Sequence, residues 1–471
     1  ADNWPVVIDV GGQIARAERR PVILPGSDVE TAVQSVTLSV QYDATDGDAF
    51  RSSFDAVDLD REDVQIAQTR LTLDGVLQSD PGAVRRFLGD LDLTATGLAL
   101  ADQNTAEALG DTLRGRAKID YVEDQPIRIT GLDLTGADYG MSGDVIIDGL
   151  QSGFPTELDL RIEAGELARF AGLAGQSLAG AAALEVTGSV TPLSSMFDLS
   201  ISGVTNNLAL GIPQADAVLT GETRLSLDAR RDVSGTFVQD LDLGNDALDV
   251  TGDFELRTDI SVVSARAALR DISLVLPQYE GPVTIVADAT QDSLGWQGDL
   301  NADAPYDSTL SVRGRATGPE TDGLFDLAVP EIRPLVPSVQ GPLNAAGRVW
   351  LTERGYNVDI DAGGPFQSEV SVAGLATGED AAVTFSAALP DIGVFVPRIR
   401  GPFSIEGDAN RAGDGWQIDT VAQGPAGTDA TIAGLVREDG TVDLDVAGAL
   451  PLGLSEPFLA PRSLQGQARF D

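Results

Sequence analysis

The sequence predicts an all-β fold: an elongated, curled antiparallel β-meander, a taco-like β-groove, built from roughly 60-residue repeats with a few short helices. Apolar and polar residues alternate along many short segments, which is the pattern of strands with one dry and one wet face. Glycine and proline are frequent, at 52 and 24 of 471 residues, and only 5% of residues are aromatic. This composition suits short strands joined by turns better than packed helices. The third observation is an internal repeat.

A Pro-x-x-x-Gly-Pro-apolar motif recurs every sixty residues, at 277–283, 337–343 and 397–403. Other positions keep the same spacing, among them three isoleucines that precede the motif and three aromatic residues that follow a glycine. A fixed period of this kind indicates a repeat architecture. We therefore divide the chain into irregular β-groove repeats with short helices over 1–220, regular repeats over 221–460, and the start of a further truncated repeat over 461–471.

The sequence pattern of each regular repeat predicts four strands followed by a Pro-rich connector. In residues 341–400 the segments LNAAGRVWLT, YNVDIDA, EVSVAGLA and VTFSAAL carry the alternation, and TERG, GGPFQS and TGEDA separate them. These separators have the composition of turns. In the connector we expect Pro337 to end strand pairing, Gly341 to permit a turn and Pro342 to fix the entry into the next strand.

Short helical segments are expected at three places, over 79–91, 104–115 and 164–178. In the first of them Asp80 fits a helix cap and Pro81 the first helical position. We interpret these segments as plugs or links between parts of the sheet. A membrane-binding role has less support, because their polar faces lack clusters of Lys and Arg.

An apolar strand face must be covered, and three architectures compete for this sequence. A β-sandwich expects core aromatics and a boundary about every hundred residues, and a β-solenoid expects roughly 20–30 residues per coil. A continuous curled sheet fits four strands per sixty residues better, and it leaves an apolar trough. With about 30 strands spaced roughly 4.8 Å apart, such a sheet would extend on the order of 140 Å.

Charge and composition exclude several function classes. The chain has 73 acidic and 31 basic residues and a formal net charge of −42, which would repel nucleic acid. Cysteine and histidine are absent, so Ser-His-Asp and Cys-His catalysis and zinc sites built on those residues are excluded. We expect no enzyme activity, no cofactor and no metal site. An enzyme with paired carboxylates is a weak alternative, since 73 acids form pairs by chance.

The restart LAGAAALEVTG at 178–188 and the stretch DLTATGLALADQNTAEALGDTLRGRAKID at 92–120, together with the sixty-residue meander, resemble the TamB family. That family belongs to the translocation and assembly module and is related to AsmA-like and repeating β-groove lipid-transfer proteins. The resemblance implies a periplasm-spanning groove in a Gram-negative bacterium that conducts phospholipid between the membranes. It also implies support of outer-membrane protein and autotransporter assembly and protein secretion, with an Omp85-type, TamA-like outer-membrane barrel as partner.

We expect this chain to be a body segment of a longer protein. It starts at ADNWPVV and stops in LQGQARFD, and neither an N-terminal anchor nor a C-terminal barrel-docking domain can be recognised in it. The inner-membrane anchor and the regions that contact the barrel are therefore expected outside the segment.

The inward strand positions are the candidate lipid contacts, because small and branched apolar residues leave room for acyl chains of phospholipids. They are Val283, Ile285, Leu310, Val312, Leu343, Val349, Val358, Val370, Val372, Phe403, Ile405, Ile418 and Ile432. For any one of them an ordinary covered core position is the alternative. Trp296, Tyr356 and Trp416 are expected at the rim of the groove, or else packed over the glycine that precedes each.

A structural or adhesive cell-surface protein with a closed core is the alternative function. Such proteins often bind calcium, and Asp43, Asp46 and Asp48 lie together in one loop that could hold an ion. An exposed acidic turn explains the same three residues.

Overall fold

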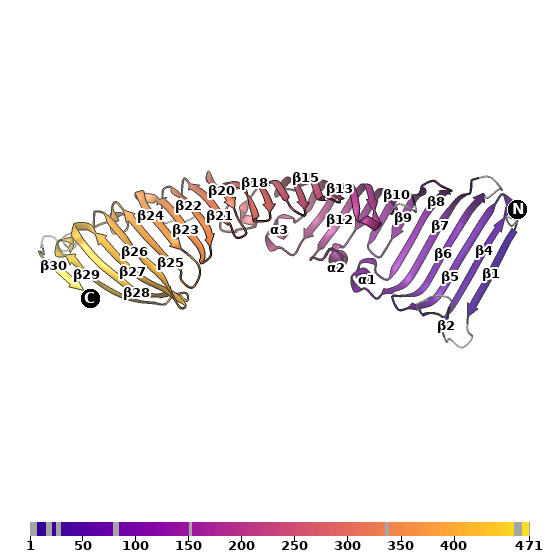
Figure 1. The fold of residues 1–471 in the computed structure, drawn as a ribbon, viewed down its shortest axis with the longest axis horizontal. Coiled ribbons are helices and arrows are strands. Elements are labelled where there is room, and N and C mark those ends of the chain that lie inside the picture. Colours follow the sequence, from indigo (N-terminus) through magenta and orange to yellow (C-terminus); the bar gives the residue numbers. More distant parts are fainter. Residues whose placement is uncertain are drawn as a thin grey trace. The chain divides into compact units, whose positions relative to one another are not determined.

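The structure is a computed structural model, and it describes residues 7–15, 21–24, 30–78, 84–149, 153–334, 339–455 and 464–470. The chain forms two compact units, Ala1–Arg257 and Thr258–Asp471. Each unit contains an antiparallel sheet in which successive strands lie side by side (Figure 1). The predicted all-β antiparallel meander is therefore confirmed. The predicted division at residue 220 concerns the regularity of the repeats, and it stays a prediction.

Unit 1 holds strands β1 to β16 within the part of the chain that the structure describes. Their bounds are β1 Val7–Ala15, β2 Val22–Ile23, β3 Thr31–Val33, β4 Ser35–Asp43, β5 Ala49–Arg61, β6 Val64–Gln78, β7 Arg86–Leu100, β8 Thr112–Val122, β9 Ile127–Thr135, β10 Tyr139–Ile147, β11 Thr156–Ala164, β12 Ala179–Thr191, β13 Met196–Ala209, β14 Glu222–Asp232, β15 Gly235–Gly244 and β16 Leu248–Arg257. From β4 to β16 each strand pairs with the next in antiparallel fashion, while β1 pairs with β4.

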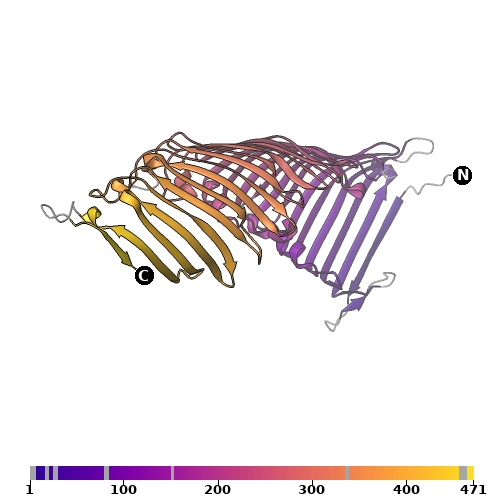
Figure 2. The same ribbon diagram turned by 60° about the vertical axis from the view of Figure 1, so that its left-hand side comes forward.

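Unit 2 holds strands β17 to β30 among its described residues. Their bounds are β17 Ser261–Leu269, β18 Val283–Asp292, β19 Gly295–Ala304, β20 Ser308–Arg315, β21 Asp322–Val329, β22 Leu343–Thr352, β23 Gly355–Gly364, β24 Ser368–Leu375, β25 Ala382–Leu389, β26 Phe403–Ala412, β27 Gly415–Gly424, β28 Thr428–Arg437, β29 Val442–Pro451 and β30 Gln467–Phe470. Figure 2 shows the orange to yellow strands of this unit following one another in chain order. Their ladders run without a register shift.

The sixty-residue period corresponds to four strands. Strands β18, β22 and β26 begin at Val283, Leu343 and Phe403, each two residues after the glycine of the repeated motif. The second strand of each repeat begins at the glycine before an aromatic residue. An even number of strands returns the chain to the same end of the strands, so the connectors of unit 2, as far as the structure describes them, begin and end at that side. Pro337, which we expect to end strand pairing, lies outside the described residues.

Helices in unit 1 are short and occupy connections between strands. They are η1 Ala44–Asp46, α1 Gln103–Leu109, η2 Leu167–Phe170, α2 Ala171–Ala174, η3 Pro192–Ser194 and α3 Pro213–Val218. Figure 1 shows α1, α2 and α3 along one edge of the sheet of this unit. Two of the three expected helical segments are thus present over part of their length. Asp102 caps α1, because its carboxylate accepts from the Thr105 N–H at 2.8 Å.

The helix expected over 79–91 is wrong for its second half. Residues 79–83, with Asp80 and Pro81, lie outside the described part, but β7 begins at Arg86. Leu91 lies between Leu73 of β6 and Ala117 of β8, and Phe87 lies opposite Tyr121. Each residue from Arg86 to Leu91 pairs with β6 on one side and with β8 on the other, and this pairing outweighs the local helix signal.

The connectors of unit 2 are closed by a carboxylate ten residues before the repeated glycine. Asp391 Oδ1 accepts the N–H groups of Gly393 at 2.9 Å and Gly401 at 3.0 Å. The Ile392 N–H in turn donates to the Gly401 carbonyl at 2.9 Å. Asp271 and Glu331 make the same contacts in the two preceding repeats. We call this arrangement the connector clamp.

Candidate functional site

The strand register of unit 2 brings all thirteen predicted lipid-contact residues to one face of its sheet. Residues directly opposite in an antiparallel ladder share a face, and residues two apart along a strand do too. Val349 lies opposite Val358, and Val370 opposite Ala387, which is opposite Ile405. The remaining predicted residues follow through the same ladders. We call this surface, from Ser261 to Phe470, the apolar face.

Charge is segregated between the two faces of unit 2. Among its described strand residues every acidic side chain lies on the face opposite to the apolar face, which we call the polar face. These acids are Asp288, Asp292, Asp299, Asp303, Asp322, Asp326, Asp359, Asp361, Glu369, Glu406, Asp408, Asp419, Asp429, Asp443 and Asp445. Arg411, at the end of β26, is the one charged strand residue described on the apolar face.

None of the thirteen apolar side chains is buried. Ten are half-buried, and Ile285, Val312 and Val370 expose 37%, 38% and 42% of their surface. A side chain in a covered core would lose almost all contact with water. The strands of unit 2 have their main contacts with the preceding and following strands of the same sheet. The apolar face is therefore shielded by its own neighbours and lacks the burial of a closed core.

The three aromatic residues predicted at a rim lie at strand ends on the apolar face. Trp296, Tyr356 and Trp416 are each the second residue of a strand that follows a tight hairpin. The glycine before Tyr356 serves a different purpose from packing the ring. A Cβ added to Gly355 would lie 2.4 Å from the Thr377 carbonyl oxygen, so this glycine permits close approach of the next loop.

Two arginine side chains on the polar face form ion pairs with aspartates. Arg315 contacts both carboxylate oxygens of Asp292, at 2.8 and 3.1 Å, and Arg348 does the same with Asp322, at 2.8 and 2.6 Å. Such two-point pairs hold the guanidinium and the carboxylate in a defined geometry. The hydrogen bonds from Arg315 lower the pKa of Asp292. The polar face is thus a solvated, mainly acidic surface on which Asp292 and Asp322 are paired with arginines.

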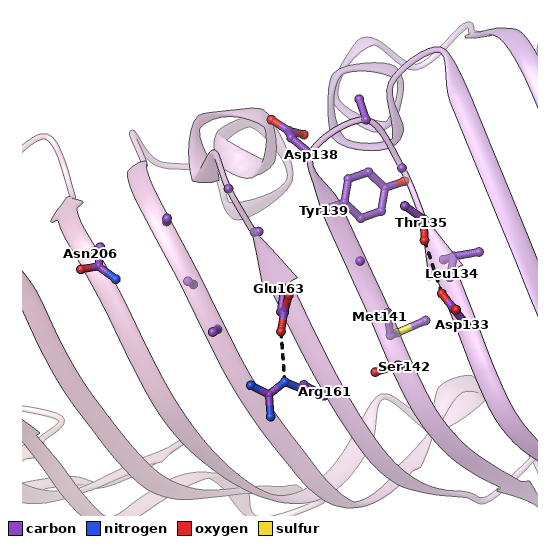
Figure 3. Close-up of a pocket in the computed structure, with 18 residues that line it drawn as sticks. Asp133, Leu134, Thr135, Asp138, Tyr139, Met141, Ser142, Arg161, Glu163 and Asn206 are labelled. Carbon is purple, nitrogen blue, oxygen red and sulfur yellow. Dashed lines mark hydrogen bonds and ion pairs between the residues drawn. The ribbon is translucent and has the colours of Figure 1, made fainter.

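A hollow of about 690 Å³ lies in unit 1 at one end of β9 to β12 (Figure 3). Two charged side chains of its lining contact each other, Arg161 and Glu163 at 3.1 Å, and Asp133 accepts from the neighbouring Arg116 at 2.7 Å. Tyr139 lies at its upper end and donates from its hydroxyl to the Leu109 carbonyl at 3.1 Å. The polar side chains of the hollow are thus used in ion pairs and in a contact to the end of α1, and we interpret the hollow as a surface depression.

The acidic loop over 43–48 is used for local structure. Asp43 accepts from the Thr45 N–H at 2.8 Å and hydroxyl at 2.6 Å, which lowers the pKa of its carboxyl, and Asp48 accepts from the Tyr42 hydroxyl at 2.9 Å. Within the described ranges, no group of three or more acids could hold a metal ion. No helix in those ranges is long and apolar enough to cross a membrane.

The sequence pattern did not reveal the connector clamp or the position of Arg411 on the apolar face. The clamp had a visible signal, because Asp271, Glu331 and Asp391 are sixty residues apart and directly precede the in-step isoleucines. The Gly401 and Gly393 N–H groups, with Arg400, lower the pKa of Asp391 to about 2.

Comparisons with protein-family models, curated proteins and solved structures found no match.

Proposed function

We propose that this chain is a body segment of a lipid-conducting β-groove of the TamB type. In this proposal it lies in the periplasm of a Gram-negative bacterium and carries phospholipid acyl chains on its apolar face. An inner-membrane anchor and the contacts to an Omp85-type barrel belong to regions outside the segment. Support of outer-membrane protein assembly and secretion follows from the same role. The observation that carries the proposal is the apolar face itself, with thirteen predicted side chains on one surface and one charge among its described strand residues.

Acyl chains suit this surface for a physical reason. Each methylene removed from water contributes roughly 0.8 kcal/mol, and an acyl chain presents many methylenes in a row. The side chains that an acyl chain would touch are half-buried valines, isoleucines, leucines and alanines, so further burial is available. Specific polar contacts are not needed along such a path, and a chain can slide over it.

The structural or adhesive alternative has less support. It requires a closed core, in which positions such as Val358 and Val372 would be buried. Both are half-buried. An exposed apolar surface of this extent is unusual for an inert structural protein and is typical of a binding surface.

The test uses two adjacent alanines of β25 that face opposite sides. Ala387 lies on the apolar face between Val370 and Ile405, and Ala388 lies on the polar face between Glu369 and Ser404. We expect phospholipid to co-purify with the wild-type protein and with Ala388→Glu, as measured by mass spectrometry of organic extracts. The same charge in Ala387→Glu should lower the lipid-to-protein ratio about tenfold, because a charge amid acyl chains is costly.

Two results would count against the proposal. One is a wild-type protein that carries no phospholipid after extraction in mild detergent. The other is equal lipid content in the two variants, since the proposal assigns the lipid to one face. Circular dichroism of both variants checks that the sheet is intact.

A further inference from the structure

Arg411 is at the edge of the apolar face, where a hollow opens between two turns. The hollow measures about 700 Å³ and is lined by Arg411 and Trp416 together with residues of the turn that joins β24 to β25, among them Thr377, Gly378 and Glu379. Arg411 and Trp416 are directly opposite in the β26–β27 ladder, and the guanidinium carbon lies 6.0 Å from the ring centre.

The repeat does not require an arginine at this position. Sixty residues earlier stands Leu351, and sixty residues before that stands Gln291. Both are also the residue opposite a rim aromatic, Tyr356 and Trp296. The backbone N–H of residue 411 donates to the Ala381 carbonyl at 2.7 Å, as the N–H of Leu351 does to Thr321 at 2.8 Å. The charge is thus an addition to a position whose backbone role is already fulfilled.

The surroundings of the guanidinium contain negative charge. Arg411 contacts a carboxylate oxygen of Glu438 at 2.8 Å, and Glu379 lines the same hollow. Glu438 is 66% exposed, so this pair is a weak surface contact. A guanidinium has five N–H donors and can hold a phosphate and a carboxylate together. One cation and two carboxylates give the site a formal charge of −1.

We propose that this hollow binds the headgroup of a zwitterionic phospholipid, with the phosphate on Arg411 and the ammonium among the carboxylates of Glu379 and Glu438. Trp416 would lie at the level of the glycerol backbone, where an amphipathic ring is favourable. An anionic headgroup without an ammonium is disfavoured by the local charge and by the net charge of −42. This inference rests on the proposed function and adds the class of lipid to it.

The experiment measures binding of three probes by native mass spectrometry: dioleoyl phosphatidylethanolamine, dioleoyl phosphatidylglycerol and dioleoylglycerol, each delivered in detergent micelles. The variants are Arg411→Gln and Arg411→Leu, which introduce the residues of the other two repeats. Arg348→Gln removes an ion-paired arginine from the polar face and is the matched control.

We expect both Arg411 variants to lower the affinity for phosphatidylethanolamine about tenfold, the typical effect of losing one charge-assisted contact. Their affinity for dioleoylglycerol should stay within about twofold of wild type, and Arg348→Gln should change neither. Wild-type protein should bind phosphatidylethanolamine more tightly than phosphatidylglycerol.

The outcomes separate the two proposals. If wild-type protein binds none of the three probes, the lipid-conducting function itself is overturned. If it binds dioleoylglycerol but Arg411→Gln leaves phosphatidylethanolamine binding unchanged, only the headgroup site is overturned. Preference for phosphatidylglycerol, or equally tight binding of chain-free glycerophosphoethanolamine, would also overturn it.

Discussion

Replacing Gly401 by alanine tests the geometry of the joint between repeats. Gly401 has φ +127°, and a Cβ placed there would lie 3.1 Å from Cβ and 3.3 Å from Cγ of Pro425. An L-residue held at such an angle costs roughly 1–3 kcal/mol. Crowding against a proline ring adds to that cost. We therefore expect Gly401→Ala to lower the free energy of unfolding of unit 2 by about 2 kcal/mol.

Gly363→Ala is the control, because it adds the same methyl group in the same unit. No heavy atom lies within 4 Å of a Cβ at Gly363 and its φ is not positive, so we expect no loss and a gain of up to about 0.5 kcal/mol. Urea unfolding can be followed by tryptophan fluorescence, since Trp296, Trp350 and Trp416 all lie in unit 2.

Hydrogen exchange gives a local measure of the same change. The Ile392 N–H donates to the Gly401 carbonyl at 2.9 Å, so its protection should fall in Gly401→Ala and stay in Gly363→Ala. Equal unfolding free energies for the two variants, with equal protection at Ile392, would refute the account of the joint.

Three further predictions concern stabilising contacts. The pKa of Asp391 is lowered from 3.8 to about 2, so its contribution is present above pH 4 and lost as the pH falls toward 2; melting temperatures of wild type and Asp391→Asn should converge over that range. Asn245→Ala removes four hydrogen bonds of a buried side chain and should destabilise unit 1 by about 3 kcal/mol in urea followed by circular dichroism, whereas exposed Asn301→Ala should change little. Arg169 pairs with Asp138 at 2.5 Å and donates to the Ala108 carbonyl of α1 at 3.2 Å, so we expect Arg169→Ala to speed proteolysis around α1; unchanged cleavage would show that Arg169 does not anchor this helix.

Much of unit 2 could be predicted from the sequence because its strands keep a strict two-residue period. The ladders from β17 to β30, described without a bulge, carry this period from strand to strand, so an alternation such as Tyr356, Val358, Ile360 fixes a face of the whole unit. Unit 1 is less regular for a physical reason. Its ladders shift register at several points, for example between Gly143 and Val145 and between Val238 and Leu241. Each shift can exchange the faces of a strand.

Other features could not be found from local patterns. The segment at Arg86–Leu91 has helix-start chemistry before it, and only its pairing partners on β6 and β8 decide that it is a strand. Arg411 stands in a turn-like context, NRAGDGW, and the parity of β26 alone places it on the apolar face. Side-chain pairing across strands is a tertiary property, which a window of one strand does not contain.

A sheet with one apolar face and no described second layer leaves part of its hydrophobic stabilisation unused. Ile285, Val312 and Val370 each retain more than a third of their exposed surface. If acyl chains occupy this face, as we propose, they supply the missing layer, and binding stabilises the folded state by mass action. At a lipid concentration one hundred times the Kd this amounts to about 2.7 kcal/mol. Delipidated protein should therefore melt at a lower temperature, with the shift reversed by added phosphatidylethanolamine in the wild type and not in Ala387→Glu. Because Ala387 and Ala388 are adjacent and face opposite sides, a rescue that succeeds equally in both glutamate variants would assign the stabilisation to general detergent effects and argue against the apolar face as its source.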